Sequence, residues 1–198
     1  MIPASRGSGG SSAHKVYDAK ALAEAMKERH GHYETLQDQL ESLRDAMAGM
    51  TKLDDVLKGK GADSIKGFYQ AQVDVANAWL DFVKVQLAFL KGVSAAAEDN
   101  DLGGNTIVDL DFLIEDLYRS DTRAKDIVAG QQEDLQKIFN GIKDILTLEV
   151  FDSGDFEDKI GEAEKERNDT IEKVATLDSD LTEEYKASES TQLYVGAL

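Results

Sequence analysis

Cysteine is absent from the 198-residue chain, and proline occurs once, at position 3. The lack of cysteine excludes disulfides and thiol catalysis. Beyond position 3, no proline ring is present to break a helix. A membrane-spanning helix needs about 18 uncharged apolar residues, but even the most apolar window, residues 76–90, contains Asp81 and Lys84. These absences favour a helical protein without covalent cross-links and without membrane insertion.

Negative charge dominates the composition, with 39 acidic and 22 basic residues and a net charge of −17. A field of this sign repels phosphate backbones and anionic lipid, so nucleic-acid binding is not expected. The first twelve residues lack the hydrophobic core of a signal peptide. If the protein is exported, it is therefore expected to use a route that accepts folded helices.

Two stripes of apolar residues at helical spacing, separated by glycines, predict an antiparallel helical hairpin. The helices are expected at residues 18–53 and 63–97. Between them, the segment Leu57-Lys58-Gly59-Lys60-Gly61 contains the strongest helix break, because glycine costs about 1 kcal/mol in a helix interior. Asp63 and Ser64 are predicted to cap the second helix. The two stripes consist of Leu22, Met26, Tyr33, Leu36, Leu40, Leu43, Met47 and Met50, and of Ile65, Phe68, Tyr69, Val73, Ala76, Trp79, Val83, Leu87 and Leu90.

A second apolar row on the second helix widens its hydrophobic arc. Val75, Phe82 and Phe89 recur at intervals of seven beside the main stripe, which includes Trp79. So wide an arc is typical of a helix that contacts more than one neighbour. Either later helices of the same chain cover this row, or helices of a partner protein do. These four residues are the candidate partner-binding residues.

The remaining sequence predicts two further long helices, so the expected fold is all-α: an elongated hairpin followed by a second helical pair. The third helix is expected at residues 109–146, after an acidic glycine loop at 98–105, and the fourth after a turn at 151–155. The expected divisions are a flexible leader (1–14), the hairpin (15–97), the second pair (98–190) and a tail (191–198). The tail is either an ordinary disordered terminus or the start of a further domain.

No residue pattern predicts catalysis, a metal site or a cofactor. His30 and His32 lie two apart and point to opposite sides of a helix, so they cannot share a metal ion. The acidic loop fails as a calcium-binding loop, since the fifth and twelfth positions counted from Asp99 are Gly103 and Leu110. An enzyme or metal protein built in a helical bundle would need Glu-x-x-His pairs, and none is present.

Two segments resemble the LXG domain, the N-terminal region of toxins exported by Gram-positive bacteria. They are Lys15-Val16-Tyr17-Asp18 and the stretch 53–69, in which Leu57 and Gly59 match the name-giving residues and Gly67-Phe68-Tyr69 matches the continuation. Gly61 lies in the same turn motif, between these two groups of matching residues. The resemblance extends over about 180 residues. Because family members begin Met-Lys-Val and His14 precedes Lys15 in this chain, residues 1–14 are interpreted as a vector-derived leader.

The resemblance implies a targeting module with no enzyme activity of its own. Such a domain recruits small helical WXG-like partner proteins and presents the toxin to a type VII secretion system, with the toxin domain C-terminal to it. The protein would then be cytoplasmic before export and afterwards secreted or associated with the cell surface. The alternative from the same heptads is a structural coiled-coil scaffold, although the breaks at 57–61, 98–105 and 151–155 divide the chain into four separate helices and a fibrous rod would carry its heptads through.

Overall fold

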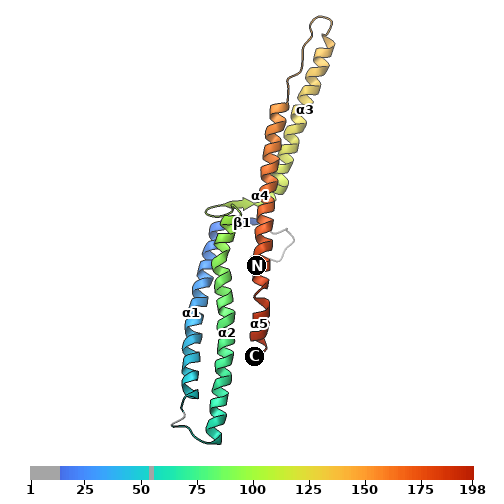
Figure 1. Cartoon of the computed structure of the whole chain (residues 1–198). Coiled ribbons are helices and arrows are strands. Elements are labelled where there is room, and N and C mark those ends of the chain that lie inside the picture. Colours follow the sequence, from blue (N-terminus) through green and yellow to red (C-terminus); the bar gives the residue numbers. More distant parts are fainter. Residues whose placement is uncertain (1–13, 54–55) are drawn as a thin grey trace. The chain divides into compact units, whose positions relative to one another are not determined.

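Long helices dominate the computed structural model, which describes residues 14–53 and 56–198 (Figure 1). The long helices are α1 (Ala19–Thr51), α2 (Lys60–Asp99), α3 (Tyr118–Gly141) and α4 (Gly154–Lys186). The shorter elements are helix α5 (Glu189–Gly196), a π-helical segment η1 (Phe112–Leu117), and strands β1 (Val16–Asp18) and β2 (Ile107–Asp109). The predicted all-α fold is confirmed. Apart from His14, the predicted leader lies outside the described residues.

Helices α1 and α2 run antiparallel and form the predicted elongated hairpin (Figure 1). They contain 33 and 40 residues, which corresponds to lengths of about 50 and 60 Å. At the start of α1, the Asp18 carboxylate accepts a hydrogen bond from the Ala21 N–H at 2.9 Å, the usual role of an N-cap residue. The buried side chains of α2 define the hydrophobic seam: Ala62, Val73, Ala76, Ala78, Leu80, Val83, Gln86, Leu90, Val93 and Ala97.

Helix α2 contacts two parts of the chain, as its wide apolar arc predicted. Besides α1, helix α5 packs against α2, and Val195 of α5 is buried. Near the end of α4, the Tyr185 ring meets the Phe89 ring of α2 edge-on, with 5.4 Å between the ring centroids. The C-terminal residues of the chain therefore supply part of the cover that α2 needs.

The chain divides into two compact units. The first contains residues 18–106 and 176–198, and the second contains residues 107–175 with the described residues that precede Asp18. This division differs from the expected one, which joined 98–190 into one pair and left 191–198 as a tail. The difference arises because α5 packs against α2, with Val195 buried, and Tyr185 near the end of α4 contacts Phe89 of α2. Most of the expected tail is the helix α5.

Two short strands were missed by the sequence analysis, which expected none. β1 and β2 form a two-stranded antiparallel sheet, flanked by hydrogen bonds from the Ala19 N–H to the Thr106 carbonyl and from the Leu110 N–H to the Lys15 carbonyl, both 3.0 Å. The central side chain of each strand is buried. Three residues are too few to show the alternation that reveals a strand, so the pattern gave no signal.

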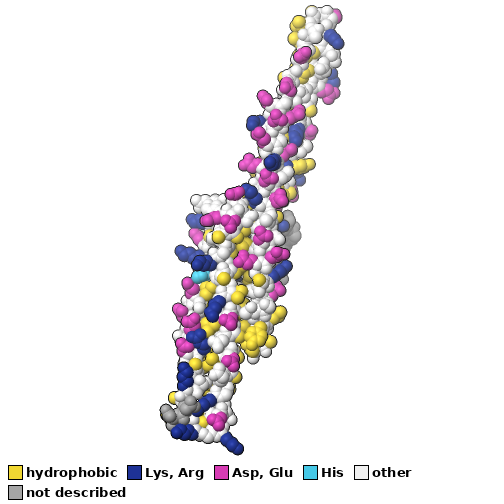
Figure 2. All heavy atoms as spheres, in the orientation of Figure 1, with side chains coloured by type: hydrophobic (Ala, Val, Ile, Leu, Met, Phe, Trp, Pro, Cys, Tyr) yellow, Lys and Arg dark blue, Asp and Glu magenta, His cyan; other side chains and the backbone are white. Residues whose placement is uncertain are grey.

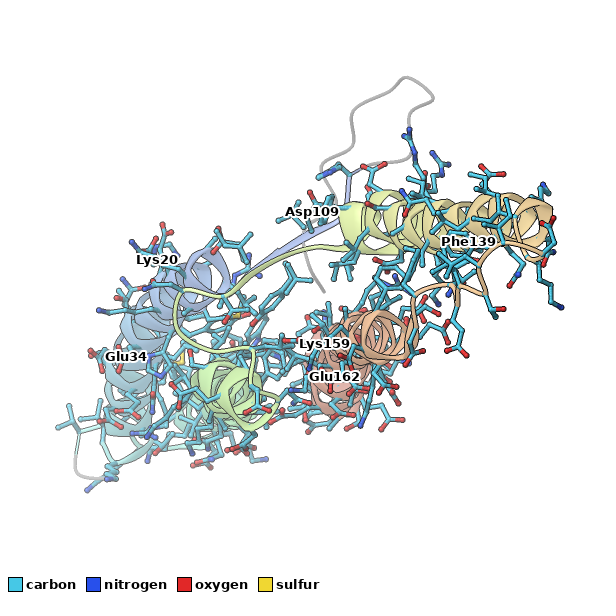
Figure 3. All side chains as sticks on the ribbon, turned by 90° about the horizontal axis from the view of Figure 1, so that it is seen from above. Lys20, Glu34, Asp109, Phe139, Lys159 and Glu162 are labelled. Atoms are coloured by element: carbon cyan, nitrogen blue, oxygen red, sulfur yellow. The ribbon has the colours of Figure 1, made fainter. Side chains whose placement is uncertain are left out.

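Each strand ends in an aspartate that caps the helical segment after it. Asp18 caps α1, and Asp109 Oδ1 accepts a hydrogen bond from the Phe112 N–H at 3.0 Å; Figure 3 labels Asp109 at this junction. The segments Val16-Tyr17-Asp18 and Ile107-Val108-Asp109 thus repeat one local design of strand, cap and helix. The third helical segment begins close to the predicted position, although its first turns are π-helical.

The helices of the second unit bury little apolar surface. Helix α3 ends at Gly141, five residues before the expected end, and residues 142–153 connect it to α4. Asp121 is the only buried residue of α3. The apolar residues that recur at helical spacing along this segment form a stripe that is half-buried at Leu110, Leu113, Leu117, Ala124, Leu135 and Ile142 but exposed at Ile127, Ile138 and Ile145. The α3–α4 pair is therefore held by polar side chains as well as by apolar contacts.

Candidate functional site

The glycine motif occupies the turn between α1 and α2. Gly59 has φ 93° and ψ 171°, a backbone conformation essentially restricted to glycine. A Cβ atom at Gly59 would meet no atom within 4 Å, so the requirement for glycine comes from the backbone angles and not from crowding. Leu57 is half-buried, and its N–H donates to the Leu53 carbonyl at 2.8 Å.

Helix α2 begins three residues earlier than expected. Gly59 is its N-cap residue, and the Gly59 carbonyl accepts the first helical hydrogen bond from the Asp63 N–H at 3.1 Å. The prediction that Asp63 and Ser64 cap this helix is wrong, because both lie inside it. The Ser64 hydroxyl instead donates to the Lys60 carbonyl at 3.1 Å, four residues back. Gly61 also lies in the first turn of α2 and not in the connection.

The aromatic residues of the motif lie near the turn. Phe68 is 60% exposed although it falls on the predicted apolar stripe, and Tyr69 is half-buried. Their rings contact each other edge-on, with 5.5 Å between centroids. The structure therefore brings the motif residues Leu57, Gly59, Gly61, Phe68 and Tyr69 to one end of the hairpin.

The second apolar row of α2 faces other rings of the first unit. Phe82 lies between Trp79 and Tyr33 of α1, with centroid distances of 6.2 and 6.5 Å. Phe89 contacts Tyr185, as described above. Val75 is half-buried, and Trp79 is 38% exposed. These contacts favour the interpretation in which helices of the same chain cover Phe82 and Phe89. Trp79 is then the most accessible of the four candidate partner-binding residues.

A buried ion pair in the second unit was missed by the sequence analysis. Arg167 of α4 donates a hydrogen bond to Asp121 of α3, and their side chains are 6% and 10% exposed. The Arg167 guanidinium also lies over the Tyr118 ring, 5.4 Å from its centroid, a distance suited to a cation–π contact. The position of Asp121 was the feature that could have revealed this pair from the sequence. Asp121 lies between Leu117 and Ala124 in the apolar stripe of the helix, where a solvated carboxylate is not expected.

A second missed feature is a buried amide in the hairpin seam. Gln86 of α2 is 3% exposed. Its Nε2 finds no hydrogen-bond acceptor among the described residues. A buried polar group without a partner lowers stability by about 1–3 kcal/mol. Gln86 is therefore a weak point of the hairpin and not part of a built site.

The histidines considered as ligands do not form a metal centre. His30 Nδ1 lies 3.4 Å from Glu34 Oε2, one turn along α1; Figure 3 labels Glu34 there. His32 is exposed. Across residues 14–53 and 56–198, no group of three or more His, Asp or Glu side chains is placed to hold a metal ion. Within the same residues, no helix combines the length and hydrophobicity needed to cross a lipid bilayer.

These features define an all-helical protein built on a glycine-turn hairpin. Residues 15–195 match the model of the LXG domain of the WXG superfamily, so the chain belongs to this family. It is 42% identical over 176 residues to "Toxin YwqJ" of Bacillus subtilis (strain 168). The aligned region covers 89% of this chain and 29% of that relative. It is 23% identical over 180 residues to "Toxin YxiD" of the same organism, covering 89% of this chain and 31% of that relative. The chain thus spans less than a third of the length of these curated relatives.

Proposed function

We propose that this chain is the targeting region of a secreted antibacterial toxin. In this proposal it binds small helical WXG-like partner proteins and directs export through a type VII secretion system. The observation that carries the proposal is the match to the LXG domain over nearly all of the described helices. Two relatives are named as toxins, which supports the same assignment.

The length of the relatives supports a division of labour within such a toxin. The chain corresponds to 29% and 31% of the two relatives. We infer that the toxic activity of the complete protein resides in a separate C-terminal domain, and that residues 15–195 contribute no catalysis. The protein would be cytoplasmic until export and then secreted or associated with the cell surface.

Exposed apolar side chains support a role in protein–protein contact. Helix α3 exposes Ile127 and Ile138 to 51% and 59%, and α2 exposes Phe68 to 60% near the hairpin turn. These side chains leave apolar surface that the described part of the chain does not cover. Helices of a partner protein would cover such surfaces in the way that α1 covers α2.

Co-expression with candidate partners tests the proposal directly. The small helical proteins encoded beside the gene would be produced together with the chain, and the complexes analysed by size-exclusion chromatography with light scattering. We expect a stable complex of defined stoichiometry, and loss of toxin export when residues 15–195 are deleted. If no neighbouring protein binds and export does not depend on these residues, the targeting function is wrong. Assembly of the chain alone into long filaments would support the structural scaffold instead.

A further inference from the structure

Two large apolar side chains near the hairpin turn are exposed to solvent. From Val73 onward the seam is closed, since Val73, Val83 and Leu90 are 8%, 0% and 5% exposed. Closer to the turn Ala62 stays buried, but Ile65 and Phe68 are 47% and 60% exposed. Phe68 continues the row of Val75, Phe82 and Phe89 at an interval of seven residues. The start of α2 therefore presents apolar side chains to solvent.

Two glycines in the first turns of α2 are not explained by the fold. Gly61 and Gly67 both lie within the helix, and a Cβ atom at either would meet nothing within 4 Å. Neither has a positive φ. Glycine in a helix interior lowers helix stability and allows another backbone to approach closely. Gly61 precedes Ile65 and Phe68 by four and seven residues and shares their face, whereas Gly67 lies on a different face.

Positive charge gathers at this end of an otherwise acidic molecule. In the sequence, residues 52–68 contain four lysines and three aspartates, a net charge of +1, while the whole chain carries −17. Figure 2 shows lysine and arginine side chains at the end of the hairpin. Lys58 and Lys60 are exposed and form no ion pair with a residue that the structure describes.

We propose that the hairpin-tip face, defined as Gly61, Ile65 and Phe68 and flanked by Lys58 and Lys60, binds an acidic amphipathic helix of the small helical partner. This inference rests on the proposed function and specifies where and by what chemistry the partner binds. Ile65 and Phe68 contact the apolar side of the partner helix, Gly61 lets its backbone approach, and the two lysines pair with its carboxylates.

Charge complementarity explains why this face is chosen over other apolar surfaces. An acidic helix is repelled by the strongly acidic remainder of the chain and attracted to the lysines at the tip. Complementary charge at one site and like charge elsewhere give specificity for position and orientation. The isoleucines of α3 differ from the tip, because the lysine next to Ile138, Lys137, already lies within ion-pair distance of Glu133 and Asp134.

A pair of matched glycine substitutions tests the site without weakening the fold. Gly61→Leu and Gly67→Leu both introduce a good helix former at an exposed helical position, so each should keep or raise the melting temperature. With the purified neighbouring small helical proteins as the probe in isothermal titration calorimetry, we expect Gly61→Leu to weaken binding at least tenfold. Gly67→Leu should bind as the wild-type chain does.

Charge reversal provides an independent test of the partner's chemistry. The double substitution Lys58→Glu, Lys60→Glu should weaken binding at least tenfold at low salt, and the difference from wild type should shrink as salt is raised. If the partner binds the wild-type chain, the Gly61→Leu chain and the charge-reversed chain equally tightly, the tip face is not the binding site. The targeting function would still stand in that case.

Two other results would also overturn the inference. If none of the neighbouring proteins binds the wild-type chain, the proposed function and this site fail together. If the wild-type chain self-associates and Phe68→Ser returns it to a monomer, the tip face binds a second copy and not a partner protein.

Discussion

Removing one charge from the buried pair of the second unit should cost far more than breaking an exposed pair. The Asp121 and Arg167 side chains are 10% and 6% exposed, so Asp121→Asn leaves a guanidinium buried without its counter-charge. Loss of one partner of such a pair typically costs about 3–5 kcal/mol. We expect a loss of this size in the stability of the α3–α4 pair, because few fully buried apolar residues support it.

A neighbouring ion pair supplies the matched control. Lys125 Nζ lies 2.8 Å from Glu164 Oε1, also between α3 and α4, but these side chains are 44% and 30% exposed. Exposed pairs contribute less than about 1 kcal/mol, so Lys125→Gln should have a small effect. The double variant Asp121→Leu, Arg167→Met removes both buried charges and should recover most or all of the stability lost in Asp121→Asn.

The assay must report on α3 and α4 separately from the hairpin. The chain has two compact units, and a single unfolding transition is not assured for such a protein. Hydrogen exchange of peptides from residues 118–141 and 154–175, combined with urea titration, measures the local opening free energy. If Asp121→Asn and Lys125→Gln open these helices equally easily, burial does not strengthen the pair and the reasoning is refuted.

Three further variants probe the hairpin, each measured by urea denaturation. Gly59→Val forces a branched side chain into a glycine-only conformation and should lower stability by about 1–3 kcal/mol; an unchanged midpoint would show that the turn adapts. Gln86→Leu removes the unpartnered buried amide and should raise stability by about 1–2 kcal/mol, whereas a loss would mean that the amide finds a partner. The double substitution Phe82→Glu, Phe89→Glu should destabilise the chain before any partner is added, because both rings contact aromatic rings of the same unit; a stable double variant that no longer binds partners would instead make this row the interface.

Periodicity was sufficient to predict the hairpin and the long helices, because an amphipathic stripe over thirty or more residues leaves few alternatives. Periodicity failed where an element is too short to show a repeat, and where the contacting residues are far apart in the sequence. Strands of three residues show no alternation, and the cap of α2 depends on the backbone angles of Gly59 and not on a capping side chain. The covering of Phe89 by Tyr185 joins residues almost a hundred positions apart, and helical spacing alone does not reveal which later segment returns to α2.

The motif residues were found through resemblance, but their local roles required coordinates. Leu57 and Gly59 lie between the end of α1 and the start of α2, whereas Gly61, which was assigned to the break, is helical. The exposure of Phe68 could not be predicted, since most of the stripe to which it was assigned, including Val73, Val83 and Leu90, is buried. The Asp121–Arg167 pair was detectable only as a charged residue in an apolar stripe.

The return of residues 176–198 to the hairpin has a consequence for synthesis on the ribosome. Because the second unit is inserted within the first, α1 and α2 leave the ribosome long before α5 is made. During that interval, the side of α2 that later contacts Val195 and Tyr185 has no cover from its own chain. A nascent chain in this state exposes apolar surface and is prone to misassembly. Translation speed across residues 100–175, and chaperones that bind exposed helices, should therefore influence the yield of folded protein more than the stability of the finished hairpin does.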